Sequence, residues 1–174
     1  MTNALIGIFR LARLDPTGID YFRNTPGAFW RSFRVALIIA PFYAGLLAMR
    51  YAMGEVSTPL LRFIIIQIIA YSIAWLAFPV IVEPICRGME RSGKFLQFII
   101  VYNWTGLLKN ILYIPLAMLS VTALLPQGRG GDFGLSILLV IMAFNWFIAK
   151  TALQIGAIDF AISLLINGYA EKIL

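Results

Sequence analysis

The sequence predicts an all-α membrane protein: a polytopic bundle of four transmembrane helices, a possible fifth, and an interfacial helix at the N-terminus. Hydrophobic residues make up 61 % of the 174 residues and charged residues only 13 %, against about 25 % charged in a soluble domain. The apolar run 63–86 contains Glu83 as its only charged side chain. A helix of that length rises roughly 36 Å, enough to cross the ~30 Å hydrocarbon core of a bilayer.

Charge and residue usage exclude several function classes. The formal net charge is +6, but the arginines bracket apolar runs, so we interpret them as topology determinants and lipid-headgroup contacts, not as a nucleic-acid surface. Cys86 is the single cysteine and histidine is absent, which excludes an intramolecular disulfide, a Cys/His zinc site and a His-assisted catalytic triad. We therefore expect no enzyme, no metal site and no cofactor.

The N-terminal segment, 1–34, is expected to lie on the cytoplasmic surface as an amphipathic, interfacial region without a cleavable signal. Its first apolar run has Leu5, Ile8, Phe9 and Ala12 at helical spacing on a lipid-facing side, and it is too short and too charged to span. Two turn signals follow, the second with Thr25 as the predicted N-cap of a new helix. The expected lipid-headgroup contacts are Arg10, Arg13, Arg31, Arg34 and Trp30.

The membrane domain is expected over 35–174. Its first two spans, about 35–53 and 63–86, are joined by a short connection and should be antiparallel neighbours. The last apolar run predicts a span over 135–158, and the tail, 159–174, is either an interfacial helix or a fifth span.

The run 95–125 is too long for one upright helix and has two interpretations. It is either one long kinked span, or an interfacial or re-entrant helix to residue 108 followed by a short span, with Lys109 at the inner headgroups. The second is favoured because 102–106 is an aromatic and amide cluster typical of a membrane interface.

The distribution of basic residues predicts the orientation. With Lys109 and Lys150 treated as embedded, a four-span chain carries nine Lys and Arg residues on the side of the N-terminus and three on the other. The positive-inside rule then places the N-terminus in the cytoplasm, and we expect an integral protein of a bacterial inner membrane.

Glu83 and Lys150 stand out as charges inside apolar runs. Helix rise places both within ~5–10 Å of the inner surface, where they can pair. Such a pair is either a proton or substrate site or a structural ion pair; their place near the membrane edge favours the structural role. Asn145, Gln154 and Lys109 complete the candidate intramembrane polar site, and Asn103 and Asn110 are expected mainly as interhelical hydrogen-bonding groups.

The second half of the chain resembles a known family. The segment 93–98 (Gly-Lys-Phe-Leu-Gln-Phe), 102–104 (Tyr-Asn-Trp) and the later residues Pro115, Trp146, Ala152 and Gly156 are similar to the membrane half of the Yip-type (Ypt-interacting) small polytopic proteins, bacterial relatives included. The resemblance covers about 60–170 and implies a compact four- or five-helix membrane domain, with membrane-shaping or trafficking roles in eukaryotic members. The chain lacks that family's acidic motif, so no GTPase-binding residue is carried over.

Two functions follow as hypotheses. The first is a non-enzymatic integral membrane protein that organises lipids or partner proteins, as a homo-oligomer or an accessory subunit. The second is a small transporter or channel component that uses Glu83 and Lys150. The surroundings of Glu83 distinguish them, because a dry ion pair supports the first and a hydrated cavity the second.

Overall fold

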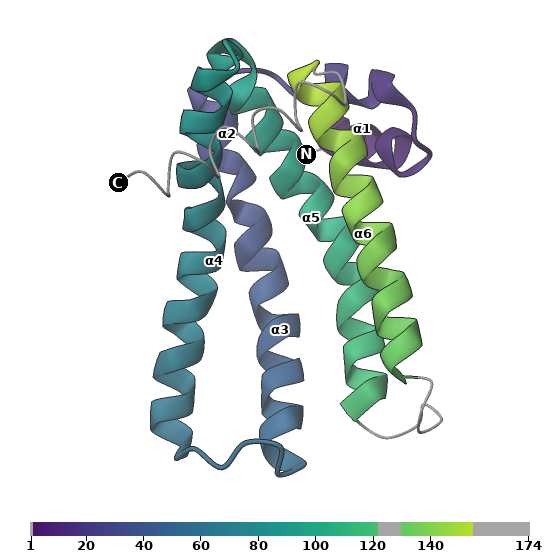
Figure 1. Cartoon of the computed structure of the whole chain (residues 1–174). Coiled ribbons are helices and arrows are strands. Elements are labelled where there is room, and N and C mark those ends of the chain that lie inside the picture. The colour runs from purple at the N-terminus through teal and green to yellow at the C-terminus, as the bar shows by residue number, and fades with distance from the viewer. Residues whose placement is uncertain (1, 122–129, 155–174) are drawn as a thin grey trace, which may run out of the picture.

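The computed structural model describes residues 2–121 and 130–154, and all of their regular structure is helical (Figure 1). The predicted all-α class is therefore confirmed for these residues. The elements are α1 (Thr2–Ala12), the 3-10 helix η1 (Pro16–Tyr21), α2 (Pro26–Ser32), α3 (Arg34–Ala52), α4 (Leu60–Gly88), α5 (Ser92–Val121) and α6 (Gly130–Leu153).

Helix α5 is the centre of the bundle. The four long helices α3 to α6 run side by side, and α1, η1 and α2 gather at one end of them (Figure 1). α5 packs against α3, α4 and α6 and also against α1 and α2. Its residues Ile99, Val101 and Thr105 are completely buried.

Among the described residues, three helical stretches are long and apolar enough to cross a membrane: Pro26–Ala52, which joins α2 and α3, Leu60–Gly88 and Leu135–Leu153. The second is the most apolar and the least buried of the three. α5 differs because its middle carries Asn103, Thr105 and Lys109. A helix surrounded by other helices can carry such groups, since protein and not lipid receives their hydrogen bonds.

The favoured division of the chain near Lys109 is wrong, because Ser92–Val121 is one continuous helix. The cluster that suggested an interface is inside the protein, where Asn103 and Trp104 are buried. Lys109 is consequently not at the first turn of a span; it lies roughly 26 Å along α5 from Ser92 at the usual helix rise. Residues 122–125 and the tail 159–174 lie outside the described residues, as does the end of the expected span 135–158.

A local sequence signal explains where α2 begins, whereas prolines inside α3 and α4 do not end those helices. Thr25 caps α2 as predicted, its hydroxyl accepting a hydrogen bond from the Ala28 N–H at 3.2 Å. α3 and α4 continue through Pro41, Pro79 and Pro84.

Helix α1 folds back onto η1 through two glycines. A Cβ on Gly7 would lie 2.9 Å from the carbonyl oxygen of Gly18, and a Cβ on Gly18 would lie 2.8 Å from that of Gly7. Leu11 is buried at this contact, and Ile8 is also buried, while Leu5 and Phe9 stay exposed. The single lipid-facing side expected for α1 is thus divided, because α1 packs on both η1 and α5.

Side-chain contacts hold the turn between α1 and η1. The carboxylate of Asp15 accepts hydrogen bonds from the hydroxyl of Thr17 at 2.7 Å and from its N–H at 3.0 Å. These bonds, the hydroxyl's first, lower the pKa of Asp15 below its ordinary value. Arg10 donates to the Thr17 hydroxyl at 2.9 Å and lies 3.5 Å from Asp15.

Candidate functional site

The predicted pair of Glu83 and Lys150 is not formed. A carboxylate oxygen of Glu83 accepts a hydrogen bond from the guanidinium of Arg87 at 2.6 Å, one turn further along α4, and both side chains are exposed. Lys150 is exposed on α6, and no salt bridge among the described residues involves it. α5 lies between α4 and α6 (Figure 1). Helix rise predicted the depth of the two charges but not the direction in which each helix presents them.

The other three members of the predicted polar site are Lys109, Asn145 and Gln154, and the structure brings only two of them together. The ammonium of Lys109 donates a hydrogen bond to the side-chain oxygen of Asn145 at 2.8 Å, which connects α5 to α6. Gln154 is exposed just beyond α6, with a positive φ of 54°. Of the five predicted residues, only Lys109 and Asn145 are in contact.

Lys109 has a second neighbour that the sequence did not indicate. Its ammonium nitrogen lies 4.0 Å from the ring centroid of Tyr102, a cation–π distance. The Tyr102 ring in turn stacks on Phe78 of α4, with 3.8 Å between ring centroids. No salt bridge among the described residues includes Lys109.

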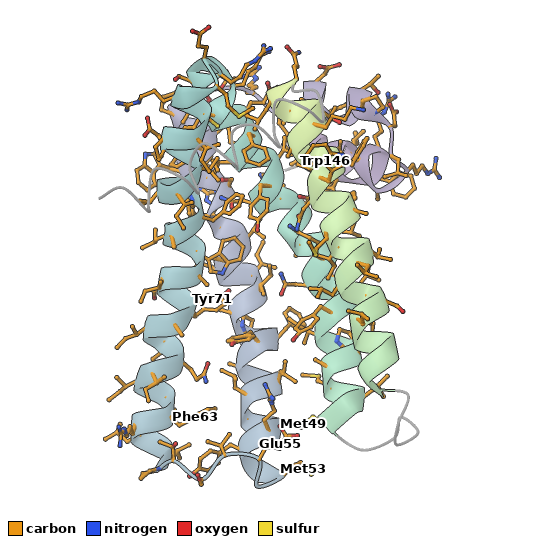
Figure 2. All side chains as sticks on the ribbon, in the orientation of Figure 1. Met49, Met53, Glu55, Phe63, Tyr71 and Trp146 are labelled. Atoms are coloured by element: carbon orange, nitrogen blue, oxygen red, sulfur yellow. The ribbon has the colours of Figure 1, made fainter. Side chains whose placement is uncertain are left out.

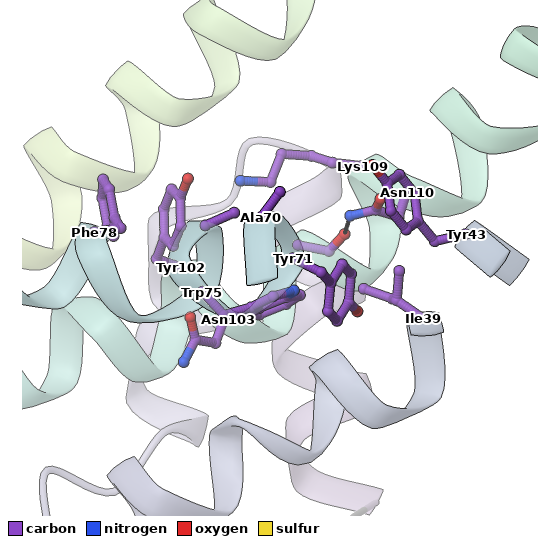
Figure 3. Close-up of a pocket in the computed structure, with 12 residues that line it drawn as sticks. Ile39, Tyr43, Ala70, Tyr71, Trp75, Phe78, Tyr102, Asn103, Lys109 and Asn110 are labelled. Atoms are coloured by element: carbon purple, nitrogen blue, oxygen red, sulfur yellow. Dashed lines mark hydrogen bonds between the residues drawn. The ribbon is translucent and has the colours of Figure 1, made fainter. Parts of the chain in front are cut away.

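A cavity of about 420 Å³ adjoins this lysine, between α3, α4 and α5 (Figure 3). α5 contributes Lys109, Asn110 and Tyr102, and α4 contributes the rings of Tyr71 and Trp75. The cavity therefore combines one cation and several amide and hydroxyl groups with aromatic walls, the usual composition of a small-molecule site.

Two tyrosines span the distance between α3 and α4 at this level. The hydroxyl of Tyr71 donates a hydrogen bond to the Ala36 carbonyl at 2.6 Å, and its ring stacks on Tyr43 with 5.4 Å between centroids. Figure 2 shows Tyr71 midway along the two helices. Long aromatic side chains bridge α3 and α4 here, and the cavity lies beside them.

Asn103 connects α5 to α2. Its side-chain N–H donates to the hydroxyl of Ser32 at 2.9 Å, and Ser32 donates to the Phe29 carbonyl at 2.6 Å. Asn103 and Ser32 are both buried. The asparagine thus has the interhelical hydrogen-bonding role that its place in an apolar helix suggested, whereas Asn110 bonds the Gly106 carbonyl of its own helix.

The predicted headgroup contacts lie on the N-terminal elements, where Arg13, Arg31 and Arg34 are exposed and Trp30 is 68 % exposed. Arg10 differs, because Asp15 and Thr17 already engage its guanidinium. Among the described residues no cluster of His, Cys, Asp or Glu suited to a metal ion occurs.

Sequence reasoning missed the cavity and its aromatic lining. Trp75, Phe78 and Tyr102 are spaced rings in apolar helices, a pattern that ordinary packing also produces. A signal was present in Lys109 itself, because a cation far from either end of a long apolar run needs a specific neighbourhood.

Comparison with known proteins adds no assignment: no protein-family model, no curated protein and no solved structure matches the chain.

Proposed function

We propose that the chain is a non-enzymatic, four-span integral membrane protein that organises lipid along the outer face of α4. This outer face is the exposed side of α4, which the rest of the protein does not cover. The resemblance to the Yip-type family, whose eukaryotic members have membrane-shaping or trafficking roles, supports this proposal. A homo-oligomer or an accessory subunit of a membrane assembly is the form in which we expect it to act.

The observation that carries the proposal is how little of α4 the rest of the protein covers. Among the residues of α4, only Pro79, Val82 and Cys86 are buried. The exposed side chains include Leu61, Ile65, Ile68, Ile73, Leu76, Val80 and Ile81. Contacts between transmembrane helices favour small residues such as Gly, Ala and Ser. Because the outer face of α4 carries bulky aliphatic side chains instead, lipid is the better fit for it.

The topology of this proposal counts α5 as the fourth span. With α3, α4, α5 and α6 crossing in alternate directions, the N-terminal elements and the α4–α5 turn share one end, which holds most of the basic residues. That end is proposed to face the cytoplasm. Trp30, Arg13, Arg31 and Arg34 then meet the inner headgroups.

A transporter or channel component is the alternative, and the cavity beside Lys109 is the observation that favours it. Glu83 and Lys150 no longer support this alternative, since Glu83 bonds Arg87 and Lys150 is exposed on α6. A transport function would have to use Lys109 and the cavity in their place.

Photolabelling tests the lipid proposal. We would reconstitute the protein in liposomes containing a phospholipid with a diazirine in its acyl chain, irradiate, and locate the adducts by mass spectrometry. We expect adducts along the exposed face of α4, with Leu138 and Val140 on α6 as exposed positive controls and Ile99 to Val101 on α5 as buried negative controls. Labelling of α6 with α4 protected would contradict the proposal.

If α4 is protected from photolabelling, a cysteine cross-link tests whether a second copy of the chain covers it. In a Cys86→Ser background, Ile73→Cys places a thiol on the exposed face of α4. An oxidative dimer at this position would assign the face to a second copy of the chain instead of lipid.

A further inference from the structure

We propose that the cavity between α3, α4 and α5 binds the carboxylate of an amphipathic organic anion, and that the ammonium of Lys109 holds this carboxylate. The inference concerns the inside of the bundle and does not depend on what covers the outer face of α4.

Lys109 has no counter-charge among the described residues. Lys109 is partly buried in the middle of the bundle, and no carboxylate among the described residues forms a salt bridge with it. A cation in such a site is costly unless an anion or several dipoles compensate it. An anionic ligand supplies the compensation that the described part of the chain lacks.

The ammonium of Lys109 has a hydrogen-bond donor left for a ligand. An ammonium has three N–H donors. One of them bonds the Asn145 oxygen at 2.8 Å, and the aromatic face of Tyr102 receives the ammonium at 4.0 Å. At least one donor is left for the cavity, which Lys109 lines. Tyr102 lines the same cavity, and its hydroxyl can donate one further hydrogen bond.

A carboxylate suits these donors. It accepts through two oxygens, so the ammonium and the tyrosine hydroxyl can each bond one of them. Hydrogen bonds between ionised partners are about twice as strong as neutral ones. A neutral ligand would leave the charge of Lys109 uncompensated.

The size and the walls of the cavity suit a ligand with an apolar body. The cavity of about 420 Å³ falls within the ~300–1,000 Å³ typical of small-molecule sites. Trp75, Phe78 and Tyr102 present aromatic surface to it (Figure 3). These walls favour an alkyl chain or a flat ring attached to the carboxylate.

The cavity opens to the surface of the protein beside the middle of α4. Ala70 and Ala74 line the cavity and are also exposed, so the cavity reaches the surface beside them. Ala74 is the central residue of α4, roughly 21 Å along the helix from either end. An opening at that level faces the hydrocarbon of a bilayer, which favours a membrane-soluble carboxylate such as a fatty acid over a water-soluble one.

Tryptophan quenching tests the inference on the full chain in mild detergent. The probes are 12-bromododecanoate, the neutral alcohol 12-bromododecanol and the water-soluble 4-bromobenzoate. We expect saturable quenching by 12-bromododecanoate that the Trp75→Phe variant loses, and no saturable quenching by the alcohol. Saturation by 4-bromobenzoate alone would support the same carboxylate site supplied from water.

Two variants examine the role of the lysine. Lys109→Met should weaken 12-bromododecanoate binding ~10-fold or more, as expected for losing one charge-assisted hydrogen bond, and Lys109→Arg should keep most of it. Lys150→Met is the matched control, because this lysine is exposed on α6 and does not line the cavity. Equal affinity in Lys109→Met and the unmodified chain would overturn the proposal.

The Ala74→Leu variant distinguishes a loss of ligand binding from a loss of folding. It narrows the opening and leaves the bond between Lys109 and Asn145 untouched, so thermal stability should hold while quenching is lost. Unchanged quenching in this variant, or saturable binding of the alcohol as tight as that of the carboxylate, would also overturn the proposal.

Discussion

At the scale of single residues, Gly7 and Gly18 determine how closely α1 approaches η1. Each would place a Cβ less than 3.0 Å from the other's carbonyl oxygen. Backbone atoms cannot rotate away as a flexible side chain can. Any larger residue at either position must therefore push α1 off η1 and disturb the packing of Leu11, which is buried at this contact.

We predict that Gly18→Ala lowers the free energy of unfolding of the N-terminal elements by ~1–3 kcal/mol, the usual cost of overpacking. Faster hydrogen exchange of the α1 amides, measured by mass spectrometry, would report the loss. Gly27→Ala in α2 is the control, because the nearest atom to its Cβ would be a side-chain nitrogen of Arg31 at 3.9 Å. Equal exchange in the two variants would show that the glycine contact is not what holds α1.

Glu83 and Lys109 are both charged residues inside apolar helices, but their interaction partners differ. Glu83 pairs with Arg87 one turn away, and because both are exposed the pair is worth only ~0–1 kcal/mol. Lys109 instead contacts Asn145 of another helix and the ring of Tyr102. The difference makes Lys109, and not Glu83, the candidate for ligand binding.

At the scale of elements, α5 holds the bundle together through polar as well as apolar contacts. It joins α2 through Asn103 and α6 through Lys109. Helix α4 differs from α5, because it is more apolar and most of its residues are exposed or only partly buried. This division is expected when one helix is shielded by its neighbours and another faces lipid.

A double-mutant cycle on Ser32 and Asn103 measures the bond between α2 and α5. Ser32→Ala should destabilise by ~1–3 kcal/mol, because it leaves a buried amide without its acceptor. Ser32→Ala combined with Asn103→Leu should cost less than the sum of the two single changes, with a coupling of ~0.6–2 kcal/mol.

Unfolding by SDS titration in mixed micelles gives these free energies. Thr105→Val is the control for the second position, since Thr105 is also buried on α5 but bonds the Tyr102 carbonyl of its own helix. Strict additivity for Ser32 and Asn103 would mean that their hydrogen bond contributes nothing to the packing of α2 on α5.

At the scale of the whole molecule, most of the basic residues and the N-terminal elements lie toward one end of the bundle. The α3–α4 turn, with Glu55 beside it, lies at the other end (Figure 2). The proposed four-span topology assigns these ends to opposite sides of the membrane.

Single-cysteine labelling tests this topology in a Cys86→Ser background. Ser57→Cys lies in the α3–α4 turn and Ser92→Cys at the start of α5, and both positions are exposed. A membrane-impermeant maleimide should label position 57 on intact cells and position 92 only after permeabilisation. Labelling of both positions from the same side would exclude the four-span topology.

The sequence by itself determined the class of this protein and the places of most of its helices. A bilayer leaves an apolar chain little choice but helices, because lipid cannot satisfy backbone hydrogen bonds. The first two predicted spans accordingly fall on α3 and α4. Thr25 was a correct N-cap prediction because a cap depends only on the next few residues.

Only the tertiary structure decided which polar groups meet. Asn145 is 36 residues from Lys109, and their contact depends on how α5 and α6 are turned against each other. The rotation of the helices also keeps Glu83 apart from Lys150. Packing around α5 likewise makes 102–106, which resembles a membrane interface in sequence, part of one continuous helix. The cavity beside Lys109 exists because α3 and α4 both pack on α5 and bridge to each other through long aromatic side chains. Such contacts follow from the rotation and packing of whole helices, which hydropathy and spacing along one helix do not specify.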